Sequence, residues 1–370
     1  MTHPRLKVGI VGLQPGRSWA ARAHVPALRA LPESYEIVGI ANTSLASAES
    51  AAAATSVPNA FNNVAELLAT PEIDIVTVTV KVPHHFEVVK AAIEAGKHVY
   101  CEWPLGSNLA EAEELAELAR AKKVQGVIGT QARLAPEIKH LRHLIADGFV
   151  GEVLSTTLIA RGGGWGGAIP DKKNFAYTLD SASGATMLTI PLGHTLAALR
   201  DVLGEVAEVS AVLATRRNTA VSLDTGETLP VSAPDQVLIS GIMASGAPIS
   251  IHYRGGMARQ GDGFLWEING TEGDIRVSAA FGHPQLLQLS LSGAQGDERS
   301  FKPLEIPDHY NLGYPTDVVP GNVARVYAQV AQDLREGTTT APNFDDAVAL
   351  HRIIAAIEEA SQSGGRVKVS

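Results

Sequence analysis

The sequence has few of the features that would place it in a specialised class. It has one cysteine, Cys101, among 370 residues, so no intrachain disulfide can form. Basic residues are not in excess, because 30 Lys and Arg stand against 39 Asp and Glu, for a formal net charge of −9. Nucleic-acid binding needs clustered positive charge, so we expect no nucleic-acid partner. The same balance fits an anionic membrane surface poorly.

Long hydrophobic runs are also missing. No stretch reaches the roughly 20 apolar residues that span a bilayer, and the first residues hold no apolar segment of the secretory type. We therefore expect a cytoplasmic protein without a membrane partner. The paired histidines His84 and His85 have no carboxylate or cysteine at the spacing of a metal-ligand set, so we expect no metal site.

Apolar, β-branched runs alternate with helical patterns over residues 1–132. Continuous apolar strands between helices are typical of a parallel sheet that is covered on both faces. This half therefore predicts a doubly wound dinucleotide-binding (Rossmann) domain. The expected strands are 6–13, 35–42, 73–80, 97–105 and 124–133, and the expected helices are 21–31, 44–54, 60–69, 85–96 and 108–123.

The pattern changes in residues 133–370, where strands are longer and alternate between apolar and polar residues. Alternation predicts an antiparallel sheet with one exposed face, and hence an α+β domain for substrate binding and oligomerisation. The last helix, about 343–363, is expected to pack back on the first domain, with Asn343 or Asp345 as its cap. The expected strands are 153–162, 205–216, 235–245, 248–256, 264–279 and 285–293, with a helix at 193–204.

A glycine-containing turn follows the first expected strand. Dinucleotide-binding turns carry G-x-G-x-x-G, which lets the backbone approach the pyrophosphate at a helix N-terminus. Gly12 fits the first position, Gln14 stands at the second, and Gly16 and Ser18 follow in a lengthened turn. The place of this turn after the first strand of a parallel sheet favours cofactor contacts from these residues and Trp19. A plain strand-to-helix connection is the alternative.

The end of the second expected strand lacks the acidic residue that binds the adenosine ribose in many such domains. Asn42, Thr43 and Ser44 stand there instead, and each can bond either a ribose or a 2′-phosphate. Without a carboxylate to repel that phosphate, NADP is allowed beside NAD and is slightly favoured. The alternative is that the three residues only form the turn.

Three segments carry a family resemblance that covers nearly the whole chain: EAGKHVYCEWPL at 94–105, LIADGFVGEVLS at 144–155 and WEINGTEGDIRV at 266–277. They resemble the glucose–fructose oxidoreductase/inositol dehydrogenase (Gfo/Idh/MocA) family. The resemblance implies a nicotinamide cofactor in the first domain and a sugar-like or cyclitol substrate over the sheet of the second. The lengthened turn and the CEWPLG segment resemble a branch of this family that includes a fungal repressor of galactose genes.

The family's catalytic positions are only partly kept. Glu102 and Pro104 match the family, whereas Trp103 stands where it has a proton-transferring Lys. His194 matches the family His, whereas Ile190 replaces the Asp four residues earlier. Tryptophan does not titrate usefully, so we interpret Trp103 as a wall of the cofactor pocket, with a packing role as the alternative. The resemblance makes His194 the leading acid/base candidate.

Other candidate residues follow from their places near these motifs. Lys81 follows the expected strand 73–80 and is the second proton-transfer candidate, or else binds ribose. The glycine-rich stretch 160–180 is expected to cover the substrate, with a flexible surface loop as the alternative, and Arg254 and Arg259 line either a pocket or a solvent face. The remaining cofactor candidates are Val82, Pro83, His85 and Gln131, and the remaining substrate candidates are Arg133, Trp165, Lys173, Tyr177 and Asp180.

Three functions remain open from the sequence. The first is an NAD(P)-dependent oxidoreductase that acts on a sugar, cyclitol or related polyol or ketone. The second is a regulatory protein that senses dinucleotide and sugar without net catalysis, which the two replaced catalytic residues favour. The third is redox-neutral elimination or glycoside cleavage with tightly bound NAD. In each case we expect a small-molecule ligand and a homo-oligomer, a dimer or tetramer.

Overall fold

The computed structural model describes residues 4–259 and 261–370 and divides into two compact units. Unit 1 comprises the chain up to Gln131 together with Gly313–Ala349, and unit 2 comprises Ala132–Leu312 together with Leu350–Ser370. The division lies one residue before the boundary expected at 132/133. It also groups 313–349, which we had expected in the second domain, with the first unit.

Unit 1 is built on a six-stranded parallel sheet of order β3-β2-β1-β4-β5-β6, which confirms the predicted Rossmann architecture. The strands are β1 (Leu6–Val11), β2 (Tyr35–Ala41), β3 (Asn59–Phe61), β4 (Ile75–Val78), β5 (His98–Glu102) and β6 (Gly126–Gly129). The helices between them are η1 (Ala20–His24), α1 (Val25–Arg29), α2 (Leu45–Ala54), α3 (Val64–Leu68), η2 (Val82–His84), α4 (His85–Glu94) and α5 (Leu109–Lys122).

Side-chain caps fix where several of these helices begin. The side chains of Ser44, Asn63 and Asn108 each accept a hydrogen bond from the backbone N–H three residues later, at the starts of α2, α3 and α5. Such caps satisfy donors that the helix itself leaves unpaired. The central strands β1 and β4 are buried along most of their length, as expected for a sheet covered on both faces. The strand ends are thereby held in fixed positions for the site.

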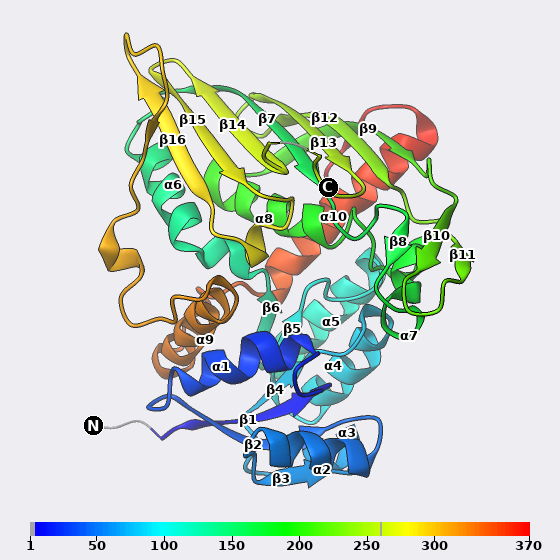
Figure 1. Ribbon diagram of the computed structural model, residues 1–370. Helices are drawn as coiled ribbons and strands as arrows, with labels where there is room; N and C mark the ends of the chain where they lie inside the picture. Colours follow the sequence, from blue (N-terminus) through cyan, green and yellow to red (C-terminus); the bar gives the residue numbers. More distant parts are fainter. Residues whose placement is uncertain (1–3, 260) are drawn as a thin grey trace. The chain divides into compact units, whose positions relative to one another are not determined.

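Unit 1 contains a long helix that the sequence analysis missed, α9 (Val318–Glu336). Asp317 caps its first turn, and Pro320 lies within that turn, where a missing backbone N–H costs nothing. α9 packs against η1 and α1 (Figure 1). Helix α10 (Phe344–Ser363) follows close to the expected range, and Asn343 caps it by accepting from the backbone N–H groups of residues 345 and 346.

Unit 2 is built on a nine-stranded sheet of order β17-β16-β15-β14-β7-β13-β12-β9-β18, in which only β7 and β13 pair in parallel among the described strands. This confirms the expected mostly antiparallel sheet. Its strands are β7 (Val153–Arg161), β9 (Val206–Ala214), β12 (Gln236–Met243), β13 (Pro248–Arg254), β14 (Phe264–Gly270), β15 (Gly273–Ala279), β16 (Ser290–Gln295), β17 (Lys302–Pro303) and β18 (Val367–Lys368).

One face of this sheet is covered and the other is open. Helices α6 (Pro136–Ala146) and α8 (Pro191–Leu203) lie along one face (Figure 1). The short turn η3 (Gln131–Leu134) precedes α6, and η6 (Pro284–Leu286) contacts α8. Among the described residues of unit 2, no helix covers the opposite face. Apolar side chains are exposed there, namely Ile159, Val212 and Leu238.

The glycine-rich stretch is more ordered than the alternative of a flexible loop suggests. It contains β8 (Ala168–Ile169), α7 (Lys172–Phe175) and η4 (Ala176–Leu179), and η5 (Ser181–Ser183) follows directly after it. β8 joins a small sheet of order β11-β10-β8 with β10 (Thr219–Ser222) and β11 (Thr228–Pro230). A small apolar core, made of Ile169, Leu179, Ala220 and Leu229, lies within this region.

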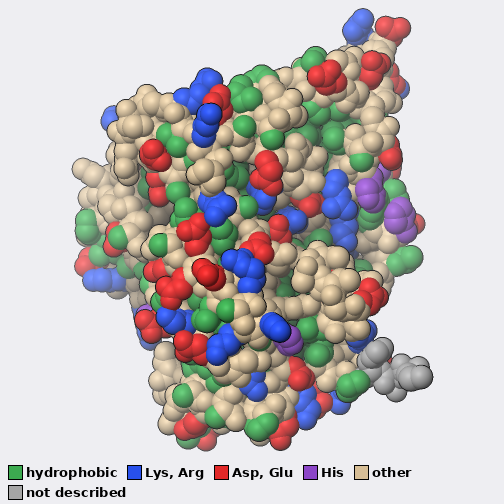
Figure 2. Space-filling view, turned by 180° about the vertical axis from the view of Figure 1, so that it is seen from behind, with side chains coloured by type: hydrophobic (Ala, Val, Ile, Leu, Met, Phe, Trp, Pro, Cys, Tyr) green, Lys and Arg blue, Asp and Glu red, His purple; other side chains and the backbone are tan. Residues whose placement is uncertain are grey.

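The surface carries mixed charge. On the face drawn in Figure 2, acidic and basic side chains are interspersed, in keeping with a net charge of −9 spread over the chain. Within residues 4–259 and 261–370, no helix is at once long enough and apolar enough to pass through a bilayer. The short turn η7 (Asp308–Tyr310) lies near the end of the first of the two segments that form unit 2.

Candidate active site

The turn after β1 requires a glycine at its first position. Gly12 has φ +99°, a region that side-chain-bearing residues rarely adopt. A Cβ there would lie 3.1 Å from the backbone carbon of Thr79 and from the backbone nitrogen of Val80. The turn therefore lies directly against the segment that follows β4. Gly16 also has a positive φ, +71°, but has open space around it, so only its conformation requires glycine.

Ser18 closes this turn from within. Its Oγ accepts from the backbone N–H of Gln14 at 2.9 Å and donates to the Gln14 carbonyl at 3.1 Å. It also accepts from the backbone N–H of Ala21 at 3.3 Å. The next side chain, Trp19, has a buried indole N–H without a partner among the described residues. Ser18 thus shapes the turn, and Trp19 keeps a donor for a ligand.

The residues after β2 hold the turn and begin the next helix. The side-chain amide of Asn42 donates to the backbone carbonyls of Leu13, at 2.8 Å, and Ser47, at 3.1 Å. Ser44 caps α2, as described above. Thr43, between them, is exposed. The turn-forming role that the sequence left as an alternative therefore accounts for the Asn42 amide group and the Ser44 hydroxyl.

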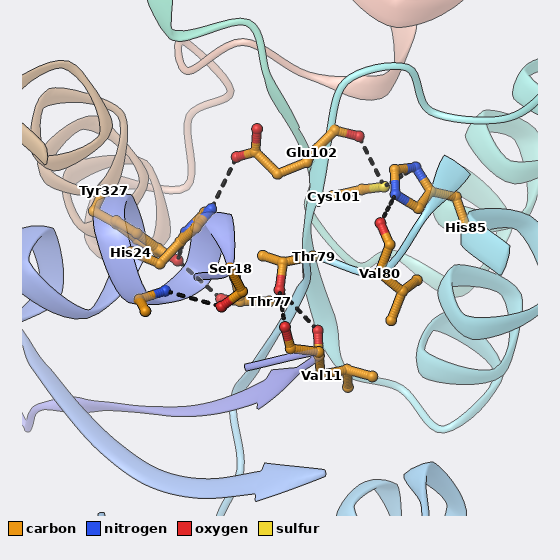
Figure 3. Close-up of polar contacts among 12 residues, drawn as sticks. Val11, Ser18, His24, Thr77, Thr79, Val80, His85, Cys101, Glu102 and Tyr327 are labelled. Atoms are coloured by element: carbon orange, nitrogen blue, oxygen red, sulfur yellow. Dashed lines mark hydrogen bonds and ion pairs between the residues drawn. The ribbon is translucent and has the colours of Figure 1, made fainter. Parts of the chain in front are cut away.

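His85 connects the loops after β4 and β5. The side chain is buried, and one ring nitrogen lies 2.7 Å from the Pro104 carbonyl. The other lies 2.9 Å from the Val80 carbonyl (Figure 3). Burial is the main influence on the ring and lowers the pKa of His85. These contacts make His85 a link between the two loops. Lys81 lies directly before η2 and is partly exposed. Within η2, Val82 is buried and Pro83 is exposed.

A buried chain of hydrogen bonds holds Glu102, the last residue of β5. His24 Nε2 lies 2.9 Å from Glu102 Oε1, and His24 Nδ1 lies 2.8 Å from the Tyr327 hydroxyl (Figure 3). That hydroxyl also lies 2.8 Å from Thr77 Oγ1. A neutral imidazole satisfies the whole chain if Thr77 donates to Tyr327, Tyr327 to His24, and His24 to Glu102. The side chains come from η1, β4, β5 and α9.

The sequence analysis selected Glu102 but missed its partners. His24 lies in the expected helix 21–31, and its place among apolar residues gave no sign of a polar contact. Tyr327 lies 303 residues from His24 along the chain, in the helix that was missed. Glu102 also packs over β6, because a Cβ at Gly129 would lie 2.6 Å from its Oε1. The carboxylate is thus fixed from both sides.

Trp103 and Gln131 are both buried, at 4% and 1% exposure. The Trp103–Pro104 peptide bond is cis. Neither end of the Gln131 side-chain amide has a partner among the described residues. Buried amides rarely stay unpaired, so a polar ligand is the natural partner. Together with the Gly12 cradle and the free indole N–H of Trp19, Gln131 provides polar contacts that fit a bound dinucleotide.

Unit 2 has a buried histidine of its own, His194, in the first turn of α8. The side chain is buried, and its Nδ1 has no partner among the described residues. Burial, with a smaller effect of nearby His283, lowers the pKa of His194 to about 3. The ring is therefore neutral at pH 7, with one donor and one acceptor nitrogen. Ile190, in place of the family Asp, directly precedes α8.

His283 is a residue of this region that the sequence analysis missed. Its ring stacks on Trp165 with centroids 6.3 Å apart and an interplanar angle of 13°. His283 Nε2 lies 3.1 Å from the Gly162 carbonyl, and the Trp165 indole donates to the Thr178 carbonyl at 3.1 Å. Two contacts therefore hold the Trp165 ring: the Thr178 carbonyl, within the same glycine-rich stretch, and the His283 ring, after β15. His283 follows an expected strand, but a single histidine there gave no further signal.

The remaining substrate candidates have contacts of their own. Arg133 pairs with Asp201 of α8 at 3.1 Å. Asp180 accepts from the backbone N–H of Ala182 at 3.0 Å and caps η5. Lys173 is exposed on α7, and burial raises the pKa of Tyr177. No group of three or more His, Cys, Asp or Glu residues in the described part of the chain is arranged to hold a metal.

Known protein families match two separate segments of the chain, one in each half. Residues 6–130 match the family described as "Oxidoreductase family, NAD-binding Rossmann fold", and residues 136–279 match "Gal80p, C-terminal domain". "Dehydrogenase aclE" of Aspergillus oryzae is 30% identical over 97% of this chain and 97% of that protein.

Regulatory and sugar-oxidising proteins are also similar. The galactose/lactose metabolism regulatory protein GAL80 of Kluyveromyces lactis is 30% identical over 77% of this chain, and the match spans 66% of that protein. The solved structure of Gal80p from that yeast has a TM-score of 0.87 at 27% identity, covering 99% of this chain and 92% of that one. Levoglucosan dehydrogenase, solved in complex with NADH and L-sorbose, shares the fold with a TM-score of 0.83 at 24% identity over both full chains.

Proposed function

Because this chain belongs to the oxidoreductase family with the NAD-binding Rossmann fold, Gfo/Idh/MocA, we propose that it is an NAD(P)-dependent dehydrogenase or reductase. Its substrate would be a sugar, a cyclitol, or a related polyol or ketone. The observation that carries the proposal is His194, a buried and neutral imidazole whose Nδ1 has no partner among the described residues. A bound nicotinamide would supply or accept the hydride.

In the oxidative direction, His194 would accept the proton of the substrate hydroxyl. The ring is neutral at pH 7 and therefore has an acceptor nitrogen for this proton. The stacked pair of Trp165 and His283 lies in the same unit and would provide a flat wall for a sugar ring. Lys81 stays the second proton-transfer candidate, supported by its place after β4.

For the cofactor, we propose contacts from the turn after β1, the loops after β4 and β5, and Gln131. The Gly12 cradle, the indole N–H of Trp19 and the unpartnered Gln131 amide support this. Trp103 would bury the ring of the nicotinamide, which fits its low exposure of 4%. NADP is proposed as slightly preferred over NAD, because no carboxylate follows β2 and Thr43 is exposed there.

A second candidate function is a regulatory protein that binds a dinucleotide. The match of residues 136–279 to the Gal80p C-terminal domain supports it, as does the presence of Trp103 and Ile190 at two family catalytic positions. We propose a homo-oligomer for either candidate function. The apolar side chains on the open face of the nine-stranded sheet, Ile159, Val212 and Leu238, support that part of the proposal. A cytoplasmic location remains a prediction from the sequence, as stated above.

The deciding experiment measures cofactor binding and turnover separately. NADH and NADPH are titrated by fluorescence, and sugars, cyclitols and their ketones are then screened by absorbance of the reduced nicotinamide. His194→Gln should bind cofactor normally and lose most turnover, while His309→Gln, an exposed histidine of the same unit, should keep both. Tight cofactor binding without any change of its redox state across the panel would favour the regulatory candidate.

A further inference from the structure

Two arginines lie side by side at the ends of neighbouring strands of unit 2. Arg161 is the last residue of β7, Arg254 is the last residue of β13, and the parallel register pairs them directly. Each follows a buried residue, Ala160 and Tyr253, so both arginines project to the open face of the sheet. Like charges at directly paired positions repel each other and destabilise a sheet. A negative charge close to both guanidinium groups would relieve this repulsion.

A cavity of about 450 Å³ lies at this place, a size typical of small-molecule sites. Its walls require glycine, because a Cβ at Gly255 would lie 2.1 Å from the Trp165 carbonyl and one at Gly166 would lie 2.8 Å from Gly256 Cα. We call it the arginine pocket. Its lining includes Arg161, Arg217, Arg259, Gly166, Gly255 and Gly256.

The positive charge of the arginine pocket is not balanced by the described residues. Arg217 pairs with the buried Asp235 at 2.9 Å, and Asp235 also accepts from the backbone N–H groups of residues 216 and 217. Among the described residues, no carboxylate lies within 4 Å of the side-chain nitrogens of Arg161, Arg254 or Arg259. Burial and then three neighbouring guanidinium groups lower the pKa of Arg161. Arg254 Nε is buried without a partner.

We propose that the arginine pocket binds a multivalent oxyanion, a small molecule that carries phosphate or clustered carboxylate groups. Guanidinium groups match both anions through paired N–H donors. Binding would replace repulsion among several arginines by charge-assisted hydrogen bonds. The residues that line the pocket do not include His194, Trp165 or His283, so we propose it as a second site and not as part of the proposed substrate site.

The test uses the full chain and three probes: inorganic phosphate, pyrophosphate and citrate, each titrated by calorimetry at constant ionic strength. We expect saturable binding, and the tighter of pyrophosphate and citrate identifies phosphate or carboxylate as the favoured group. The double variant Arg161→Gln/Arg259→Gln should weaken that binding at least about tenfold, since both side chains line the pocket and each lost charge-assisted bond carries roughly that factor. Arg299→Gln, an exposed arginine outside the pocket, is the matched control and should bind as the wild type does.

A second readout needs no ligand. Without an anion, the double variant should melt at or above the wild-type temperature, because two repelling charges are gone. Melting several degrees below wild type would mean that the arginines are structural and would overturn the proposal. So would the absence of saturable binding of all three probes, or an equal loss of affinity in Arg299→Gln. A change of oligomeric state with unchanged anion affinity would instead assign the pocket to acidic side chains of a second copy.

Discussion

Two buried histidines, one in each unit, use their ring nitrogens differently. His24 has both nitrogens bonded, one to Tyr327 and one to Glu102. His194 is buried to a similar degree, yet its Nδ1 has no partner among the described residues. Burying a polar atom without a partner is costly, so a fold keeps one mainly where a ligand will complete it. The comparison separates a histidine that positions other groups from one that is available for chemistry.

The largest effect is expected at His194. His194→Gln keeps a side chain of similar length but cannot take up a proton, so turnover should fall by about 10²- to 10⁴-fold. The free energy of unfolding should change little, because Nδ1 makes no bond that the variant would break. Steady-state kinetics with the substrate found in the panel, together with urea unfolding, measure the two quantities. A large loss of stability with modest loss of turnover would reverse the roles assigned to His194 and His24.

His24→Leu is the opposite test, made in unit 1. It leaves the Glu102 carboxylate and the Tyr327 hydroxyl without their buried partner, which should lower the free energy of unfolding by about 2–4 kcal/mol. Hydrogen exchange of peptides from β5 and α9 would report the loss within unit 1, while peptides of β14 serve as an internal reference. Unchanged exchange in β5 and α9 would show that the hydrogen-bond chain is not needed for the stability of that unit.

These two histidines also show what the sequence could predict. The pattern of apolar residues was enough for the main strands of both sheets, because strand burial leaves a period that can be counted. The single strand expected at 264–279 is two strands, β14 and β15, and the edge strands β3, β17 and β18 were not predicted. His194 and Glu102 were found through the family motifs. His24 and Tyr327 were not, because 303 residues separate them and only the folded chain brings them together.

Helix α9 was missed for a local reason. Pro320 and Gly321 near its start look like helix breakers in a sequence. In the structure Pro320 lies in the first turn, where it is tolerated, and a Cβ at Gly321 would lie 2.5 Å from the Pro315 carbonyl. The short strands β8, β10 and β11 were missed because so few residues carry no measurable periodicity. The sequence does not show that a buried polar group such as the Gln131 amide lacks a partner, because its neighbours come from distant parts of the chain.

Acidification provides a comparison within unit 2. Burial lowers the pKa of His194 to about 3 and that of His351 to about 4, below the usual value near 6.5. The unfolded chain therefore binds protons first, so stability is greatest above about pH 6.5 and falls as the pH drops toward 4. Each histidine contributes a slope of up to about 1.4 kcal/mol per pH unit. Urea unfolding at pH 7, 6 and 5 should show a shallower slope for His351→Gln, and an identical slope would contradict the assignment.

The smallest effect is expected from Tyr327→Phe, which removes one hydroxyl and keeps the ring. His24 Nδ1 and Thr77 Oγ1 would lose their shared partner, while the bond from His24 to Glu102 survives. The expected loss is about 1–2 kcal/mol, less than for His24→Leu, measured by urea unfolding and by exchange in β5. Tyr314→Phe is the matched control, because the Tyr314 ring packs on a guanidinium and its hydroxyl has no hydrogen bond among the described residues. Equal losses in the two variants would mean that the hydroxyl of Tyr327 adds nothing to the stability of this hydrogen-bond chain and does not orient His24.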